Sequence, residues 1–108
     1  VPARLSKPIP ILEIDCDELT NQAGLYLVSG DPEKEKLYVG ETLDLGKRLQ
    51  IQFQGKPLDV WREHIQERDL YVRMFKAEPQ AKDLLGYQTL LIGKHRPRLN
   101  WDSREFAA

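Results

Sequence analysis

The pattern of apolar segments and turn-forming residues predicts a β-hairpin in the first half of the chain. Two short segments, Gly24–Ser29 and Lys36–Glu41, are rich in apolar and aromatic residues, which is typical of strands. The six residues between them, 30–35, are highly charged and rich in turn formers, which favours a short connection. We therefore expect two neighbouring antiparallel strands joined by an exposed loop.

Within this hairpin, side chains two residues apart point to the same face of the sheet. If the strand register matches, Tyr26 and Tyr38 emerge side by side, and Gly24 and Gly40 leave room beside them. The same rule places Lys36 on the face of Tyr38. The opposite side, expected to face the core, is supplied by four apolar residues: Leu25, Leu27, Leu37 and Val39.

The remaining pattern predicts three helices and one more strand. Apolar residues at four-residue spacing predict a helix from Leu43 to Phe53, with Thr42 as its N-cap. A second helix is expected over Leu58–Gln66, a strand over Leu70–Phe75 and a last helix over Gln80–Lys94. This order predicts an α+β domain with a small, three-stranded, mainly antiparallel sheet that is flanked by helices.

The chain divides into one domain and two flanking segments. Three prolines within residues 1–22 oppose a helix there, so we expect an extended lead-in, in which residues 9–14 could form an edge strand. The domain itself is expected over residues 23–101, followed by a tail over residues 102–108. A start at Val1 in place of methionine is expected of a processed chain or an excised fragment.

Composition indicates an ordinary globular protein. A chain of 108 residues with 41% hydrophobic and 31% charged residues suits one domain with one core. No apolar run approaches the roughly 20 residues of a membrane helix, and no signal-peptide pattern is present at the N-terminus. A single cysteine, Cys16, cannot form an internal disulfide or a cysteine metal cluster, so we expect a reducing, cytoplasmic compartment.

The net charge of −1 is unevenly distributed along the chain. Residues 1–45 hold 4 Lys/Arg against 9 Asp/Glu, whereas residues 46–108 hold 12 against 8. The second part therefore presents either a basic face, centred on residues 94–98, or a solvated surface of mixed charge. A dedicated nucleic-acid binder is usually far more basic. If this chain binds DNA, we expect a companion domain or subunit to supply most of the affinity.

One polar residue interrupts the apolar stripe of the last predicted helix. The stripe is formed at about 100° per residue by Ala81, Leu84, Leu85, Leu91 and Ile92. Gln88 falls near its middle, and His95 lies close to the same direction. Because an unsatisfied buried polar group costs about 1–3 kcal/mol, Gln88 is either a hydrogen-bonded core residue or part of a site. His95 is likewise either a helix-end residue that satisfies carbonyls or a ligand-binding residue.

Four short features occur in a characteristic order. They are Gly24-Leu25-Tyr26, Tyr38-Val39-Gly40, Arg48 and the ending Pro97-Arg-Leu-Asn100. This set resembles the GIY-YIG nuclease family, whose two name-giving tripeptides and downstream arginine have the same order and similar spacing. The resemblance covers most of the chain, from Ala23 to Asn100.

The resemblance implies a metal-dependent endonuclease that hydrolyses DNA phosphodiester bonds. Tyr26 would accept the proton of the attacking water and Tyr38 would support it, although the two roles could be exchanged. Arg48 would hold the scissile phosphate and stabilise its growing charge, while one Mg²⁺ or Mn²⁺ ion would polarise it. The expected substrate-binding residues are Gly40, Lys47, His95 and Asn100.

The metal ligand is where the chain departs from that family. The residue nine positions before Pro97 would be a metal-binding glutamate, but here it is Gln88, whose amide has no negative charge. Neither Asp83, about 140° away around the helix, nor Glu41, at a strand end, is a convincing substitute. We therefore expect an inactive or impaired nuclease or, alternatively, a non-catalytic nucleic-acid-binding or interaction module on the same fold. Gln88 is either native or a deliberate isosteric change, and the sequence leaves both open.

Overall fold

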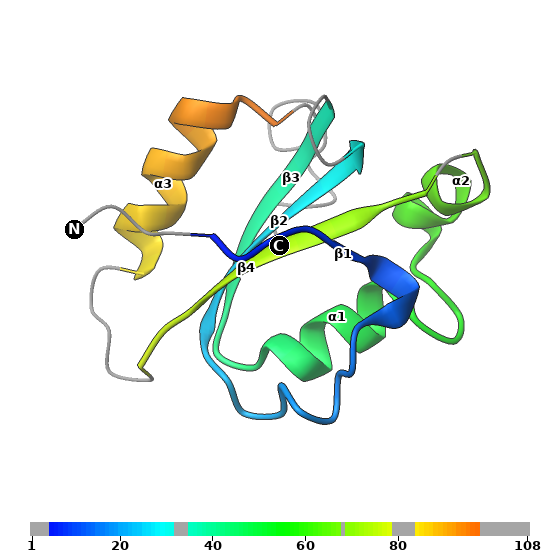
Figure 1. Ribbon diagram of the computed structural model, residues 1–108, viewed down its shortest axis with the longest axis horizontal. Helices are drawn as coiled ribbons and strands as arrows, with labels where there is room; N and C mark the ends of the chain where they lie inside the picture. The colour runs from blue at the N-terminus through cyan, green and yellow to red at the C-terminus, as the bar shows by residue number, and fades with distance from the viewer. Residues whose placement is uncertain (1–4, 32–34, 68, 79–83, 98–108) are drawn as a thin grey trace.

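The computed structural model describes residues 5–31, 35–67, 69–78 and 84–97 (Figure 1). These residues form an α+β fold with one antiparallel sheet, whose strands lie in the order β1-β4-β2-β3. In chain order the elements are β1 (Ile9–Pro10), a 3-10 turn (Ile11–Glu13), β2 (Gly24–Asp31), β3 (Glu35–Thr42), α1 (Leu45–Phe53), α2 (Asp59–Glu67), β4 (Tyr71–Lys76) and α3 (Leu84–His95).

The predicted α+β class is confirmed, but the predicted number of three strands is wrong. The N-terminal segment adds β1, which pairs antiparallel with β4 at the edge of the sheet. Pro10 has no backbone N–H to donate, which suits an edge position. The edge strand expected over residues 9–14 is shorter than predicted because a 3-10 turn begins directly at Ile11.

Helices and loops cover both faces of the sheet (Figure 1). On one face, α1, α2 and the N-terminal segment build the larger core cluster, which contains Ile11, Ile14, Cys16, Leu19, Tyr26, Val28, Leu37, Tyr38, Leu45, Leu49, Phe53, Trp61, Leu70, Val72 and Met74. On the other face, α3 covers a smaller cluster of Leu25, Leu27, Val39 and Leu91. The face that carries the two tyrosines is therefore also a core face.

A β-bulge in the hairpin changes the faces of two residues. Val28 lies opposite Tyr38, but the next residue, Ser29, lies opposite Lys36, so Leu37 is an extra residue in β3. Leu37 consequently joins the cluster of Tyr38, and the prediction that it faces the other side is wrong. Lys36, expected on the face of Tyr38, is shifted by the bulge to the face of Ser29.

The helix α1 begins two residues later than predicted, because its N-cap is Asp44. One carboxylate oxygen of Asp44 accepts a hydrogen bond of 2.9 Å from the backbone N–H of Lys47. Thr42, the predicted cap, instead accepts a 3.1 Å bond from the N–H of Asp44 and so shapes the preceding turn. Gly46 is required in the first turn, since a Cβ there would lie 2.9 Å from the carbonyl carbon of Leu19.

The two later helices are confirmed where the structure describes them. The helix α2 lies within one residue of its predicted bounds, and Trp61 on it is fully buried. The predicted start of the last helix, at residue 80, lies outside the described residues. None of the helices described here is long and apolar enough to cross a membrane.

Candidate functional site

The two motif tyrosines come from neighbouring strands and lie side by side, as expected. Tyr26 of β2 is opposite Gly40 of β3, and Tyr38 is opposite Val28, so both rings occupy one face. Their ring centroids are 6.0 Å apart, with an angle of 48° between the planes. Gly40 makes this arrangement possible, because a Cβ at that position would lie 2.6 Å from the Cε1 atom of Tyr26.

Both rings are nevertheless core residues as well as motif residues. Tyr26 is 0% exposed and Tyr38 is 6% exposed. Trp61, from α2, packs against Tyr38 in an edge-to-face arrangement, with the ring centroids 6.1 Å apart. The rings therefore contribute to packing, and any ligand reaches the Tyr38 hydroxyl more readily than that of Tyr26.

The helix α1 supplies two polar side chains to the same place. Gln52 is 7% exposed, and its Oε1 accepts a hydrogen bond of 3.1 Å from the Tyr26 hydroxyl. Arg48 lies one helical turn earlier, on the same side of α1, and is half-buried. Its guanidinium lies close enough for its positive charge to act on both tyrosines. A guanidinium and two phenol groups therefore converge, as the sequence predicts.

Burial raises the pKa of Tyr26 far above its ordinary value, and the neighbouring Tyr38 raises it further. The positive charge of Arg48 opposes this shift without cancelling it. The pKa of Tyr38 is also raised by burial, with Arg48 lowering and Glu41 raising it. Both phenols are therefore protonated at neutral pH and act as donors. In this arrangement neither is prepared to accept a proton from water.

Gln88 is held by the backbone of the strand that carries Tyr38 and Gly40. The residue is half-buried on α3, and its Nε2 donates a 3.3 Å hydrogen bond to the carbonyl oxygen of Val39. The sequence left open whether Gln88 is a hydrogen-bonded core residue or part of a site; the structure places it, half-buried, between α3 and the sheet. The helix α3 covers the sheet face opposite the tyrosine rings.

The donor set does not fit a resident magnesium ion. Mg²⁺ in proteins is usually held by one or two carboxylates with water, and Gln88 offers only an amide. Glu41 is close enough to Tyr38 to influence its pKa, but it lies opposite Leu25, on the sheet face away from the tyrosine rings. Among the residues that the structure describes, no three His, Cys, Asp or Glu side chains are grouped so that they could hold a metal.

The other predicted substrate-binding residues are not all brought to this place. Lys47 is exposed on the first turn of α1, next to Arg48. His95, at the end of α3, lies instead among a group of cations that includes Lys36 and Arg73. Asn100 lies outside the described residues. The sequence analysis did not assign a role to Gln52, although its spacing of four residues from Arg48 was a usable signal.

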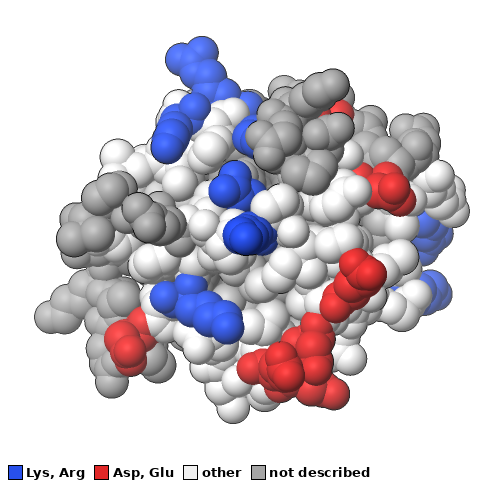
Figure 2. All heavy atoms as spheres, in the orientation of Figure 1, with Lys and Arg blue, Asp and Glu red and all other residues white. Residues whose placement is uncertain are grey.

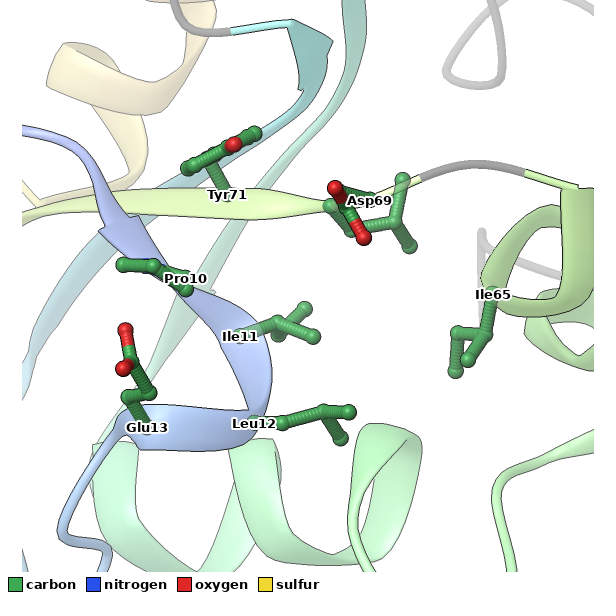
Figure 3. A pocket seen from close by; sticks show the side chains of 8 residues that line it. Pro10, Ile11, Leu12, Glu13, Ile65, Asp69 and Tyr71 are labelled. Carbon is green, nitrogen blue, oxygen red and sulfur yellow. The ribbon is translucent and has the colours of Figure 1, made fainter.

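A surface pocket of about 310 Å³ lies away from the tyrosines (Figure 3). In the figure, Ile11, Leu12 and Ile65 extend into the space between the 3-10 turn and α2, with Glu13 and Asp69 near its edges. Acidic side chains also gather on this part of the surface, over the segment that follows β1 (Figure 2). An apolar pocket with carboxylates at its rim does not suit a phosphate group.

A scan of the chain against protein-family models finds no match, and a search of curated proteins finds none either.

Proposed function

We propose that this chain is a GIY-YIG-type domain that binds DNA through its phosphate groups and hydrolyses it weakly or not at all. The observation that carries the proposal is the position of Arg48, whose positive charge acts on both Tyr26 and Tyr38. These residues stand in the order and spacing of the family motif, and Gly40 fits closely against the first ring.

The donor character of the site supports phosphate binding. A guanidinium offers a planar fork of N–H donors that matches two phosphate oxygens. The Tyr38 hydroxyl, protonated at neutral pH, adds another donor next to it. Arg48 is only half-buried, so its side chain is accessible to a ligand at the surface of α1. The exposed Lys47 adds a positive charge on the same helical turn.

The same features support weak hydrolysis. Gln88 replaces the carboxylate that the family resemblance assigns to the metal, and its amide is bonded to Val39. The raised pKa of Tyr26 leaves its phenol protonated, so a proton from the attacking water has no acceptor there. We therefore propose a domain that holds DNA better than it cuts it and works with a companion DNA-targeting domain or subunit.

A DNA-binding and cleavage experiment tests this proposal. Binding of a labelled duplex at low salt is measured for the unchanged chain, for Arg48→Ala and for the control Lys56→Ala, which changes an exposed cation on the α1–α2 loop. We expect Arg48→Ala to weaken binding at least about tenfold, because a bidentate contact to a charged group is lost. The control should lose about threefold or less. No DNA binding by the unchanged chain would refute the proposal.

The variant Gln88→Glu tests whether the chain has a nuclease site that lacks only the metal-binding carboxylate. Cleavage with Mn²⁺ present is measured for the unchanged chain and for this variant. Gain of cutting in the variant supports a nuclease site that lacks one carboxylate. DNA binding without cutting in both proteins supports instead a binding module on the same fold.

A second candidate is an interaction module that has no contact with nucleic acid. The complete burial of Tyr26 and its bond to Gln52 favour this candidate, because both features also serve stability. It predicts that no variant changes DNA retention, since even the unchanged chain retains none at low salt.

A further inference from the structure

We propose a second phosphate-binding site on the α3 side of the sheet, formed by the cations around His95 and by the buried hydroxyl of Ser29. Its ligand is a phosphate of the nucleic-acid backbone, so this inference rests on the proposed function and extends its contact area. The cations are Lys36 from β3, Arg73 from β4 and Lys94 from α3.

The strand register brings these residues together. Ser29 of β2 lies between Lys36 of β3 and Tyr71 of β4, which are its partners on the two sides. Arg73 is two residues further along β4 than Tyr71 and therefore points to the same face. The bulge at Leu37 is essential here, because without it Lys36 would point to the tyrosine side. A Lys and an Arg therefore flank the strand that carries the serine.

The hydroxyl of Ser29 is a buried polar group that could donate to a ligand. The residue is 1% exposed, and its Oγ has no hydrogen-bond partner among the described residues. Such groups are rare in folded proteins, and each costs about 1–3 kcal/mol. A phosphate oxygen is a strong acceptor for this O–H. Because Ser29 is covered, an anion meets the cations first and reaches the hydroxyl only when side chains move aside.

The electrostatic field at the end of α3 favours an anion. The pKa of His95 is lowered first by burial and then by the positive charges of Lys36, Lys94 and Arg73. No carboxylate among the described residues contributes to this shift. Figure 2 shows Lys and Arg side chains gathered over α3 and the middle of the sheet, while Asp and Glu lie mainly elsewhere on that face.

The strand β3 connects this site to the one at Arg48. It is one of the two edge strands of the sheet, and the two sites lie on its two faces. Lys36 and Tyr38 are two residues apart, which corresponds to about 7 Å along the strand. Each strand of duplex DNA carries a phosphate for about every 3.4 Å of helix axis. A backbone that crosses the edge of β3 can therefore contact both sites within a few nucleotides.

The salt dependence of duplex binding tests the inference. The double variant Lys36→Gln/Lys94→Gln removes two of the cations, and Lys56→Gln/Lys76→Gln removes two exposed cations elsewhere as a matched control. Each lost phosphate contact lowers the magnitude of the slope of log binding constant against log salt concentration by about 0.9, so we expect a decrease of about 1.8 for the first variant. Its duplex binding at 0.1 M salt should then be at least about tenfold weaker. A slope equal to that of the control would overturn the inference.

The arms of the experiment separate this inference from the proposed function. If Arg48→Ala loses affinity and Lys36→Gln/Lys94→Gln does not, the inference is wrong and the Arg48 site stands. If the unchanged chain binds no duplex, both are wrong. Inorganic phosphate is titrated in parallel and followed by the imidazole resonances of His95. A response to free phosphate without any effect of the double variant on duplex binding would also overturn the assignment to a nucleic-acid backbone.

Discussion

The close contact between Gly40 and Tyr26 allows one substitution to be predicted in detail. In Gly40→Ala, the new methyl group would lie 2.5 Å from the Tyr26 hydroxyl oxygen and 2.6 Å from Cε1. These separations are far shorter than any van der Waals contact. The ring cannot swing outward, because Tyr26 is 0% exposed and its hydroxyl is bonded to Gln52 at 3.1 Å.

The expected cost follows from these two facts. Overpacking a well-filled core typically costs about 1–3 kcal/mol. Displacement of the ring would also break or lengthen the bond to Gln52, which contributes about 1 kcal/mol. We therefore expect Gly40→Ala to lower the free energy of unfolding by about 2–4 kcal/mol. This is a large fraction of the roughly 5–15 kcal/mol of a typical domain.

Urea denaturation followed by tryptophan fluorescence measures this change. The matched control is Gly86→Ala on α3, where a Cβ would meet nothing within 4 Å. Alanine is the better helix former there, so the control should be stabilised by up to about 1 kcal/mol. In a double-mutant cycle, the cost of Gly40→Ala should shrink when Tyr26→Ala removes the ring. Equal stability of Gly40→Ala and the unchanged chain would refute the predicted contact.

Three further predictions concern the elements around the site. Asp44→Ala should lower the free energy of unfolding by about 0.5–2 kcal/mol in urea denaturation, because α1 loses its N-cap bond to Lys47. Gln52→Leu should lower it by about 1–3 kcal/mol in the same assay, because the buried Tyr26 hydroxyl loses its acceptor. Stability should fall above about pH 10 by up to about 1.4 kcal/mol per pH unit, because the unfolded chain releases the tyrosine proton there while buried Tyr26 keeps it.

Each of these predictions has a contradicting outcome. If the urea midpoint and the denaturation slope of Asp44→Ala equal those of the unchanged chain, another group caps α1. Gln52→Leu as stable as Gln52→His, which retains a ring nitrogen as an acceptor, would show that the bond to Tyr26 contributes little. For the alkaline transition, Tyr26→Phe is the comparison. If the variant and the unchanged chain lose stability with the same pH slope, the buried phenol is not the cause.

The elements of the hairpin could be predicted from sequence because their pattern is local. Two short apolar segments and the turn-rich loop between them are enough to place β2 and β3, and the side-by-side tyrosines follow from strand geometry. The bulge at Leu37 could not be predicted, because no glycine or proline marks it. It is a property of the pairing between two strands. Its effect is large, since it sends Lys36 to the other face of the sheet.

The convergence of Arg48 with the tyrosines was predictable, whereas their burial was not. Helical spacing places Arg48 on the sheet-facing flank of α1. Its position downstream of the two tyrosine tripeptides indicates that it belongs to the same site. Burial of Tyr26 depends on α2 and on the N-terminal segment, which are distant in sequence and pack over the rings only in the folded chain. The sequence also could not show that Asp44 rather than Thr42 is the N-cap of α1, because both residue types are good N-caps.

The most direct test of the account is whether the Arg48 guanidinium contacts a phosphate. The ¹⁵N and ¹³C resonances of the Arg48 side chain and the Tyr38 ring are followed while a short DNA duplex is added at low salt. We predict that both sets of signals shift together with one saturation curve, and that the shift of the Tyr38 ring signals disappears in Arg48→Ala. Saturating DNA binding that leaves the resonances of Arg48 and Tyr38 unmoved would contradict the account.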